Sequence, residues 1–461
     1  MAGDKHKAHL TIPELHDSQR NFFASGTTKS VAYRLEKFGK LEKTIRDSER
    51  EILKCLQTDL GKPEVESYVS EVYFLLHEIR RTRKMLRRWV KPEKARNPFY
   101  FLPAKSEIRR EPFGTVLAMA PWNYPFQLSL SPLIGAIASG NTVILKPSEK
   151  APATSTILKQ IVSEVFEPAH ATVVTGGPDV ASALLEIPFD LFFFTGGEKV
   201  GRVVAAAAAK HLSPVVLELG GKSPCIVDRT ADIDISAERI VSGKFLNAGQ
   251  TCMAPDFVAA EESIRKPLSD KIRQLLEERY GNNREEDIAR MIDPGRFDEI
   301  MKVVVGPVYE TGGNNRKSLK ISPKLLPRAK WTDASMNQEI FGPVLPVVSF
   351  HDIDDLLKQL RALPPPLALY IFSRNSKFRE SIAQSMPSGS ICYNDVIKQA
   401  TNFDLPFGGV GASGMGRYRG KAGFETFTYS RSVTKRYFWK DPFTLEPPYE
   451  NALERLRKIL K

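Results

Sequence analysis

The short apolar run Val116-Leu-Ala-Met119 is the first of a series that decides the fold class. The series continues with Thr142-Val-Ile-Leu145, Ala171-Thr-Val-Val174, Leu191-Phe-Phe-Phe194 and Val215-Val-Leu217. Helix-forming segments separate the runs, notably residues 154–166 and the alanine-rich residues 200–211. Apolar runs that alternate with helices indicate βαβ units and a parallel sheet. We therefore predict an α/β protein whose first domain is a doubly wound nucleotide-binding domain.

The chain has 461 residues, which is too long for one ordinary core. We place the nucleotide-binding domain at residues 1–218, a second α/β catalytic domain at residues 219–405, and a C-terminal loop, oligomerisation strand and tail at residues 406–461. The proline-flanked stretch at about residues 95–111 predicts a protruding hairpin. Residues 423–433 alternate in polarity like an edge strand, which gives a small β oligomerisation element.

Early in the chain, an apolar stripe at helical spacing runs from Leu35 to Leu60. Gly61 and Pro63 follow it, and glycine is typical of the position just after a helix. The stripe therefore predicts helix that stops at Gly61.

The charge balance indicates an ordinary surface. Lysine and arginine total 66 and aspartate and glutamate total 54, so the formal net charge is +12. Part of the excess lies in the run Arg80-Arg-Thr-Arg-Lys-Met-Leu-Arg-Arg88, which we interpret as a solvated helix face. No nucleic-acid-binding motif accompanies it, so we expect no nucleic-acid partner. The amphipathic tail around Leu453 is too short to span a membrane, and we expect it to dock on its own dimer rather than on lipid.

Four cysteines, Cys55, Cys225, Cys252 and Cys392, are widely spaced and contain no Cys-x-x-Cys pair. This spacing is typical neither of a disulfide framework nor of a zinc site, and the seven scattered histidines add no metal-ligand spacing, so we expect no metal. The N-terminus lacks the apolar core of a signal peptide, and no apolar run reaches membrane-spanning length. A reducing, cytoplasmic location is therefore expected.

Cys252 is the strongest candidate for chemistry. It ends the polar stretch Asn247-Ala-Gly-Gln-Thr-Cys252, which follows helical-looking residues. A thiol at a turn of small residues can be approached by a substrate, whereas a lone cysteine elsewhere is more often structural packing. A nucleophilic thiol has a pKa of about 8.5 or lower. Three further polar residues in short motifs support a site here: Glu218, Asn123 and Glu339.

These residues lie in motifs that together resemble the aldehyde dehydrogenase superfamily. The motifs are Ala120-Pro-Trp-Asn-Tyr-Pro-Phe126, Leu145-Lys-Pro-Ser-Glu149, Phe194-Thr-Gly-Gly197, Val215-Val-Leu-Glu-Leu-Gly-Gly-Lys-Ser-Pro224, Gln338-Glu-Ile-Phe-Gly-Pro343 and Leu405-Pro-Phe-Gly-Gly-Val-Gly-Ala-Ser-Gly-Met-Gly-Arg417. The resemblance covers the chain from about residue 20 to about residue 440. Gly249-Gln-Thr-Cys-Met-Ala-Pro-Asp256 and Pro366-Leu-Ala-Leu-Tyr370 make it most similar to the class 3-like branch.

The resemblance implies NAD(P)-dependent oxidation of an aldehyde to a carboxylic acid. Cys252 would attack the carbonyl carbon and carry a thiohemiacetal and then a thioester, and Glu218 would activate the water that releases the acid. Asn123 could be a helix N-cap, but the resemblance places its amide, with the backbone N–H of Cys252, in an oxyanion hole. Tyr124 and Phe403 are candidates for an apolar pocket, which suggests medium- or long-chain aliphatic or aromatic aldehydes.

The cofactor phosphates are expected at Thr195, Gly196, Gly197 and Gly201, where an apolar run ends and a helix begins. Free backbone N–H groups and the helix dipole attract a pyrophosphate at such a turn. The resembled family often has serine, asparagine or threonine in this turn, where this chain has Gly197 and Lys199.

The cofactor riboses are expected at two other places that the resemblance indicates. Lys146 and Glu149 follow a strand edge, and a carboxylate there favours NAD over NADP because it repels a 2′-phosphate. Lys146 could offset that repulsion, so NADP stays possible. Glu339 would hold the nicotinamide ribose, with Phe341 against the ring region.

A second glycine motif, Gly409-Val-Gly-Ala-Ser-Gly414, matches the G-x-G-x-x-G dinucleotide fingerprint letter for letter. That fingerprint needs a strand before it and a helix after it. Here Pro406 and Phe407 precede it, and a further glycine-rich stretch follows. We therefore predict a tight structural loop near the active site.

Two alternatives to this function stay open. A related enzyme could pass the acyl group to coenzyme A, but Glu218 argues against it because a deacylating water needs a base and a thiol acceptor does not. A catalytically silent binding protein on the same fold is disfavoured by the joint presence of Cys252, Glu218 and Asn123. In the resembled family the hairpin near residue 100 and the edge strand mediate dimer contacts, so we expect a homodimer.

Overall fold

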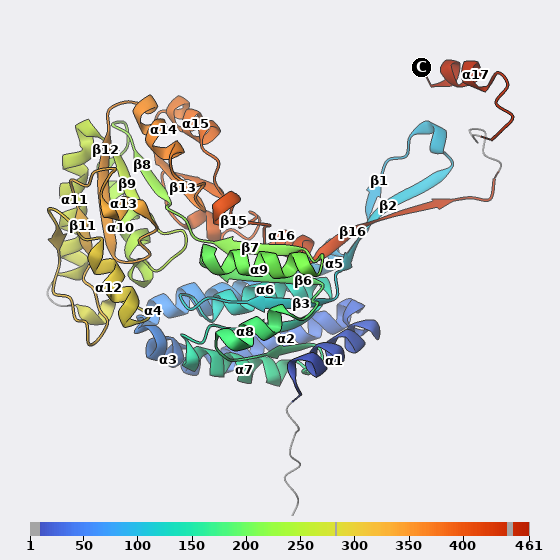
Figure 1. The fold of residues 1–461 in the computed structure, drawn as a ribbon, viewed down its shortest axis with the longest axis horizontal. Coiled ribbons are helices and arrows are strands. Elements are labelled where there is room, and N and C mark those ends of the chain that lie inside the picture. The colour runs from blue at the N-terminus through green and yellow to red at the C-terminus, as the bar shows by residue number, and fades with distance from the viewer. Residues whose placement is uncertain (1–9, 282–283, 440–445, 461) are drawn as a thin grey trace, which may run out of the picture. The chain divides into compact units, whose positions relative to one another are not determined.

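A computed structural model describes residues 10–281, 284–439 and 446–460. The chain divides into a large unit, Met1–Trp89 with Pro112–Thr428, and a small unit, Val90–Glu111 with Tyr429–Lys461, which we call the hairpin unit. The large unit contains two sheets with helices packed on them (Figure 1). The predicted α/β fold class is confirmed.

The first sheet has the strand order β15-β7-β6-β3-β4-β5. Its strands are β3 (Thr115–Met119), β4 (Thr142–Lys146), β5 (Ala171–Val173), β6 (Leu191–Gly196), β7 (Val215–Leu219) and β15 (Gly414–Met415). The five predicted apolar runs are all strands and pair in parallel, whereas β15 is antiparallel to β7. The chain leaves β3 first toward β5 and then toward β7, which is the predicted doubly wound order.

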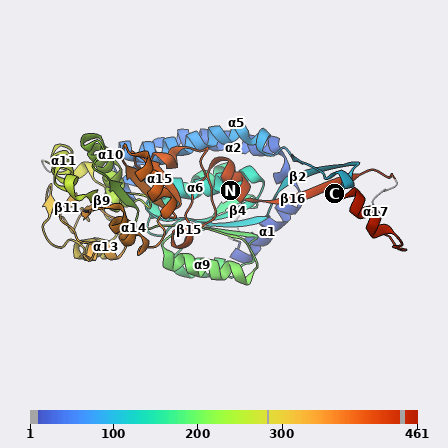
Figure 2. The same cartoon turned by 90° about the horizontal axis from the view of Figure 1, so that it is seen from above.

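Helices cover both faces of this sheet. α6 (Gln127–Ser139) packs on β3 and β4, and α7 (Pro152–Val165) on β5. α9 (Glu198–Lys210) packs on β6 and β7 on the face opposite α6 (Figure 2). The remaining helices here are α1 (Ile12–Ala24) and α8 (Pro178–Leu185). Because both faces are covered, β3 and β4 are buried throughout, which explains their unbroken apolar sequence.

The N-terminal apolar stripe forms two helices, α2 (Val31–Asp47) and α3 (Glu49–Leu60). They are separated at Ser48, whose φ of −95° and ψ of 6° leave the helical range. The end at Leu60 is confirmed, because Gly61 caps α3 with a φ of 56°. A continuous helical stretch follows, made of α4 (Glu64–Ser67), the π-helix η2 (Tyr68–Tyr73) and α5 (Phe74–Trp89).

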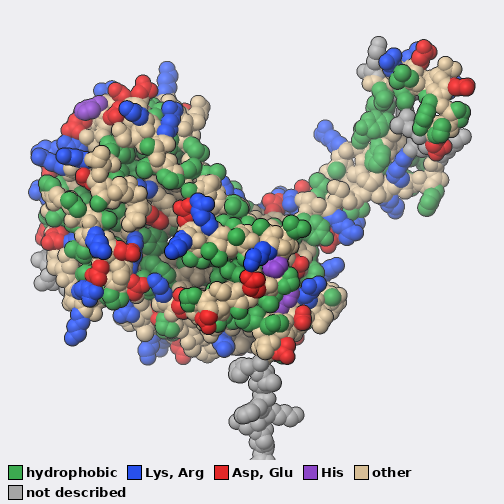
Figure 3. All heavy atoms as spheres, viewed as in Figure 1, with side chains coloured by type: hydrophobic (Ala, Val, Ile, Leu, Met, Phe, Trp, Pro, Cys, Tyr) green, Lys and Arg blue, Asp and Glu red, His purple; other side chains and the backbone are tan. Residues whose placement is uncertain are grey.

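The basic run lies on α5, where its charged side chains are exposed or half-buried. Two of them pair with one acidic residue of α2: a guanidinium nitrogen of Arg83 lies 2.6 Å from Glu42, and one of Arg80 lies 3.6 Å from it. Figure 3 shows basic and acidic side chains interspersed over the visible face. The interpretation of this run as a solvated helix face is confirmed.

The second sheet of the large unit has the order β10-β11-β12-β9-β8-β13-β14. Its strands are β8 (Pro224–Val227), β9 (Phe257–Glu261), β10 (Tyr309–Glu310), β11 (Lys324–Leu326), β12 (Val344–Phe350), β13 (Ala368–Phe372) and β14 (Ser390–Tyr393). Its helices are α10 (Ile233–Phe245), α11 (Glu262–Tyr280), α12 (Pro294–Lys302), α13 (Ala334–Asn337), α14 (Ile353–Arg361) and α15 (Ser376–Ser385). Since β15 returns to the first sheet from beyond residue 405, the domain boundaries at 218 and 405 stay a prediction.

The hairpin unit contains a sheet of order β1-β2-β16. β1 (Glu93–Ala95) and β2 (Ala104–Pro112) form the predicted antiparallel hairpin. The edge-strand prediction for residues 423–433 is wrong in its first part. There α16 (Gly420–Thr426) precedes β16 (Thr428–Arg436), because Phe424 and Phe427 are buried three residues apart, which is helical spacing. The amphipathic tail forms α17 (Ala452–Ile459).

None of the helices in the described ranges is long and apolar enough to cross a lipid bilayer.

Candidate active site

The cysteine follows a turn of unusual backbone conformation. After α10, the residues Asn247, Ala248 and Gly249 have φ values of 53°, 52° and 74°. Only glycine fits at the third position, because a Cβ atom there would overlap the carbonyl group of Gly342. The side-chain amide of Gln250 donates to the carbonyl oxygen of Asn247 at 3.1 Å and closes the turn. Cys252 therefore follows a turn whose backbone conformation is held by Gly249 and Gln250.

Cys252 lies where two cavities meet. The narrow cavity, of about 380 Å³, is lined by residues of β6 and β7, such as Thr195 and Glu218, and by loop residues, such as Asn123 and Glu339. The wide cavity, of about 580 Å³, is lined mainly by apolar side chains, such as Phe74. Cys252 is half-buried and lines both. One thiol can therefore face two different ligands.

Glu218 is a buried carboxyl group on β7, 1% exposed. Its neighbours in the sheet are Thr195 on β6 and Gly414 on β15. Among the described residues, no donor reaches either carboxylate oxygen with full hydrogen-bond geometry. Burial raises the pKa of Glu218 to about 7, and the nearby Cys252 thiol and Arg419 guanidinium lower it by less. Such a group can exchange protons near neutral pH.

The pKa of the Cys252 thiol corrects the expected value of 8.5 or lower. Burial raises this pKa well above its ordinary range, and the carboxyl group of Glu218 raises it further, while the Arg419 guanidinium lowers it. A sulfur atom removed from water disfavours the thiolate. Cys252 is therefore mainly a neutral thiol at pH 7, and Glu218 is the adjacent group that can take its proton.

Asn123 is buried in the turn between β3 and α6 and lines the narrow cavity. One N–H of its side-chain amide donates to the carbonyl oxygen of Gln250 at 3.0 Å. The amide carries two hydrogen atoms, so the second can serve another acceptor. The N-cap alternative is wrong, because α6 begins at Gln127 with Phe126 in the cap position.

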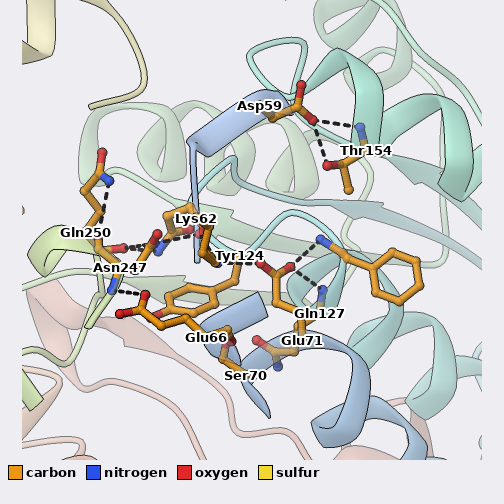
Figure 4. Close-up of polar contacts among 12 residues, drawn as sticks. Asp59, Lys62, Glu66, Ser70, Glu71, Tyr124, Gln127, Thr154, Asn247 and Gln250 are labelled. Carbon is orange, nitrogen blue, oxygen red and sulfur yellow. Dashed lines mark hydrogen bonds and ion pairs between the residues drawn. The ribbon is translucent and has the colours of Figure 1, made fainter. Parts of the chain in front are cut away.

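An ion pair that the sequence did not reveal supports the Asn123 turn (Figure 4). Lys62 Nζ lies 2.5 Å from a carboxylate oxygen of Glu71, and both side chains are fully buried. The ammonium group lies 4.0 Å from the ring centroid of Tyr124 and donates to the Asn123 carbonyl oxygen at 3.3 Å. The other oxygen of Glu71 accepts the backbone N–H of Phe126 at 2.9 Å. The ion pair therefore holds the backbone of the turn that contains Asn123.

The same helical stretch also contacts the cysteine turn. Glu66 in α4 accepts the backbone N–H of Asn247 at 2.9 Å (Figure 4). Glu71 lies one turn further along, within the π-helix η2. π-Helical turns occur frequently at functional sites, because they redirect side chains. One segment thus holds both loops that bear the candidate site.

The predicted cofactor residues fall into two groups. Thr195, Gly196, Gly197, Glu339 and Phe341 line the narrow cavity. Gly201, Lys146 and Glu149 are not in that lining. Gly201 lies inside α9, where a Cβ atom would press on Leu219. Lys146 Nζ lies 3.2 Å from a carboxylate oxygen of its neighbour Glu149, which is largely exposed.

The hydrogen-bond donors and charged groups that line the narrow cavity suit a dinucleotide. Gly197 caps the N-terminus of α9, where backbone N–H groups are free. The hydroxyl group of Thr195 is buried without a hydrogen-bond partner in the described ranges. Lys150 and Arg296, which the sequence did not indicate, also line the cavity and suit phosphate groups.

Glu339 also lines the narrow cavity and is half-buried. Burial raises its pKa to about 8, and the carboxyl group of Asp256 adds to the rise. The backbone N–H of Gly221 lowers this pKa by less, as a donor to the carboxylate. A group so placed can accept a proton or a hydroxyl hydrogen.

The wide cavity holds one of the two predicted pocket residues. Tyr124 lines it, and its hydroxyl group lies 2.7 Å from that of Thr251. Phe403 is absent from the lining and packs behind Phe74, with ring centroids 4.9 Å apart. Arg419 also lines the cavity, and no motif pointed to it.

The Gly409–Gly414 motif is the predicted structural loop. It forms a short 3-10 turn, η7 (Gly411–Ser413), and leads into β15. Gly414 lies opposite Glu218 in that pairing. The loop therefore supports the strand that carries Glu218. In the described ranges, no group of three or more His, Cys, Asp or Glu side chains is arranged to hold a metal ion.

A thiol, a buried carboxyl group and a dinucleotide-compatible cavity on this α/β fold are typical of an oxidoreductase. The sequence pattern of the aldehyde dehydrogenase family matches residues 14–433, and the chain belongs to that family. It is an NAD(P)-dependent aldehyde dehydrogenase.

Three similar proteins illustrate the match. The 4,4'-diaponeurosporen-aldehyde dehydrogenase of Staphylococcus aureus is 40% identical over 458 residues, which cover 97% of this chain and 98% of that protein. Aldehyde dehydrogenase family 3 member H1 of Arabidopsis thaliana is 40% identical over 468 residues, which cover 100% of this chain and 97% of that protein. The solved substrate-bound structure of Staphylococcus aureus AldH has a TM-score of 0.95 at 39% identity. The match covers 98% of this chain and 100% of the chain in that structure. The predicted similarity to the class 3-like branch is confirmed.

Proposed function

We propose that this enzyme oxidises a medium- or long-chain aliphatic or aromatic aldehyde to its carboxylic acid, with the carbon atom bound covalently to Cys252 on the way. The observation that carries the proposal is the position of this thiol at the meeting point of the two cavities. The wide, mainly apolar cavity suits the aldehyde, and the narrow one suits the cofactor. The Staphylococcus aureus relative is named for a diaponeurosporen aldehyde.

The first step is attack of the Cys252 sulfur on the carbonyl carbon, which gives a thiohemiacetal. The thiol proton is released to solvent as the carbon–sulfur bond forms, and Glu218, whose pKa is raised by burial to about 7, stays available as the base of the second step. The free amide N–H of Asn123 and the backbone N–H of Cys252 stabilise the oxyanion. When bound, the nicotinamide cofactor supplies the oxidant that converts this carbon to the thioester level.

The second step is hydrolysis of the thioester. Glu218 then accepts a proton from the attacking water, and the acid leaves Cys252 as a thiol. A buried carboxyl group without a fixed donor is suited to this task, because no hydrogen bond has to break before it binds water.

For the cofactor, we propose that Thr195, Gly196 and Gly197 hold the pyrophosphate, and that Glu339 and Phe341 hold the nicotinamide end. Gly201, which the sequence predicted as a cofactor residue, is not in the cavity lining, and we propose that it lets α9 approach β7 closely. Lys146 and Glu149 remain our candidates for the adenosine ribose. The exposed Glu149 carboxylate favours NAD, while Lys146 beside it makes NADP acceptable.

We further propose a homodimer in a reducing cytoplasm. The hairpin unit exposes large apolar side chains, including Phe99, Tyr100 and Trp439, which are 53%, 47% and 72% exposed. Exposed apolar side chains that lie close together in the chain favour association with a second copy. Phe403 does not line the substrate pocket, and we propose that it supports the pocket by packing against Phe74.

One assay tests the activity. The enzyme is incubated with n-alkanals of increasing length and with benzaldehyde, with NAD and NADP in separate reactions, and reduced cofactor and acid product are both quantified. We expect equal amounts of the two products and a kcat/KM that rises with chain length. Reduced cofactor formed only when coenzyme A is added would support the acyl-transferring alternative instead. No reduced cofactor with any aldehyde would overturn the proposal.

A further inference from the structure

Arg419 is a buried cation in the wall of the wide cavity. It is 7% exposed and lines that cavity together with Cys252. Its backbone φ is 75°, a value that residues with a side chain rarely adopt. Such a conformation persists only where the surroundings impose it, and this occurs most often at functional sites.

Aromatic rings hold the guanidinium group in place. Its central carbon lies 3.9 Å from the ring centroid of Phe407, 4.9 Å from that of Phe74 and 5.4 Å from that of Tyr418. One terminal nitrogen donates to the carbonyl oxygen of Ala400. These contacts fix the plane of the group but use few of its five N–H donors. Nε is buried and has no hydrogen-bond partner among the described residues.

The charge of Arg419 is not neutralised by direct contact. No carboxylate in the described part of the chain lies within 4.0 Å of the guanidinium nitrogens, so Glu78 and Glu218 act on it only from a greater distance. A buried cation without a direct partner is costly, and an anionic ligand would offset that cost.

Counted together with Arg419, the charged groups that line the wide cavity have a net positive charge. The basic residues are Arg239, Arg279, Lys398 and Arg419, and the acidic ones are Glu238 and Asp395. Four basic groups against two acidic ones leave an excess of two positive charges. A cavity of this sign attracts anions.

We propose that Arg419 binds a carboxylate carried by the aldehyde substrate, so that the preferred substrates are oxo acids with an aldehyde at one end and a carboxylate at the other. The proposal rests on the function proposed above, which places the aldehyde in the wide cavity. The planar guanidinium matches a carboxylate through two parallel N–H donors. The apolar walls would contact the chain between the two ends.

The test compares ω-oxo carboxylic acids with n-alkanals of the same carbon number, in the wild type and in Arg419→Met and Arg419→Lys. We expect one chain length at which the wild type prefers the oxo acid by at least about ten-fold in kcat/KM. Arg419→Met should remove that preference, so that kcat/KM falls more for the oxo acid than for the alkanal of the same carbon number. Arg419→Lys should keep part of it, because the charge remains and the two-point geometry is lost. Arg229→Met, at an exposed surface position, is the matched control.

A second readout does not depend on turnover. In a Cys252→Ala background, calorimetry should show that a dicarboxylic acid product binds more tightly than the monocarboxylic acid of equal length. Arg419→Met should abolish this difference in affinity. Thermal unfolding verifies that each variant folds, and Arg419→Lys takes the place of Arg419→Met if the latter does not.

The outcomes separate the two proposals. If the wild type oxidises alkanals as well as oxo acids at every length, the role of Arg419 is wrong and the proposed function stands. Equal losses for both series in Arg419→Met would also overturn it, because the arginine would then support the thiol instead of the substrate. A protein that oxidises neither series contradicts the proposed function itself.

Discussion

The carbonyl oxygen of Asn123 accepts a hydrogen bond from the side-chain amide of Asn247, at 2.8 Å. The two residues are 124 positions apart, one before α6 and the other in the turn that precedes Cys252. This bond fixes the proposed oxyanion donor relative to the proposed nucleophile. The Asn123 side chain can therefore be removed without loss of the bond, which the backbone makes.

The first prediction depends on this difference between the backbone of Asn123, which makes the bond, and its side chain, which does not. Asn123→Ala should lower kcat by roughly 10²–10³-fold, as expected for the loss of one oxyanion donor. Cofactor affinity, measured by fluorescence titration with the reduced cofactor, should not change. Asn314→Ala at an exposed position is the control. A kcat within a few fold of the wild type would remove Asn123 from the oxyanion hole.

The second prediction concerns the thiol. Cys252→Ser should abolish aldehyde oxidation and leave cofactor binding intact, because a hydroxyl group is a far weaker nucleophile than a thiol. Cys55, Cys225 and Cys392 should each tolerate the same change. Steady-state rates for the four variants provide the measurement. Substantial turnover in Cys252→Ser would contradict the mechanism.

The third prediction concerns Glu218. Glu218→Gln keeps the shape and removes the base, so steady-state oxidation should fall by roughly 10²–10⁴-fold. A burst of reduced cofactor near one per active site should remain, and the acyl group should appear as a mass adduct on Cys252. Loss of the burst as well would mean that Glu218 is required for activation of the thiol. Unchanged turnover would deny it a role as a base.

The pH dependence of the wild type is the companion measurement. The raised pKa of Glu218, about 7, means that its carboxylate form predominates only above that pH. Hydrolysis of the thioester should therefore accelerate as the pH rises through about 7 and then level off. Glu218→Gln should lack this inflection, and an inflection that survives in the variant would belong to another group.

The fourth prediction concerns the buried ion pair. Lys62→Met leaves the Glu71 carboxylate buried without its cation, which should lower the free energy of unfolding by about 3–5 kcal/mol. Urea denaturation measures this change. The exposed pair of Lys43 and Asp47 is the control, and Lys43→Met should change stability by less than about 1 kcal/mol. Equal effects in the two variants would show that burial of the first pair has no special importance.

The fifth prediction is the homodimer. Multi-angle light scattering at micromolar concentration should give twice the mass of the 51.6 kDa chain. Tyr100→Lys and Trp439→Lys, both in the hairpin unit, should shift the protein toward monomer, because they place charge on exposed apolar positions. A wild type that is monomeric under these conditions would end this proposal.

The sequence predicted the strands of the first sheet well, because strands buried on both faces read as unbroken apolar runs. It also indicated Cys252, Glu218 and Asn123, since each lies in a short motif of distinctive residues. It did not predict α16, because the alternation of the later residues was extended back over residues 423–426, although Phe424 and Phe427 are at helical spacing. Local patterns of this length cannot decide between the two periods.

The supporting residues of the site could not be predicted for a different reason. Lys62 and Glu71 look like ordinary surface charges along a helix, and only the fold brings them together beneath the Asn123 turn. Arg419 likewise follows a glycine-rich loop and contacts rings from distant segments. Long-range packing decides the role of such residues, and no spacing in the sequence encodes it.

Two cavities adjoin one sulfur atom, because Cys252 belongs to the walls of both. If the aldehyde and the dinucleotide occupy these two cavities as we propose, they do not have to share an entrance. On that proposal, a spent dinucleotide could be replaced while the acyl group is still attached, and the order in which the two products depart would be set by their affinities.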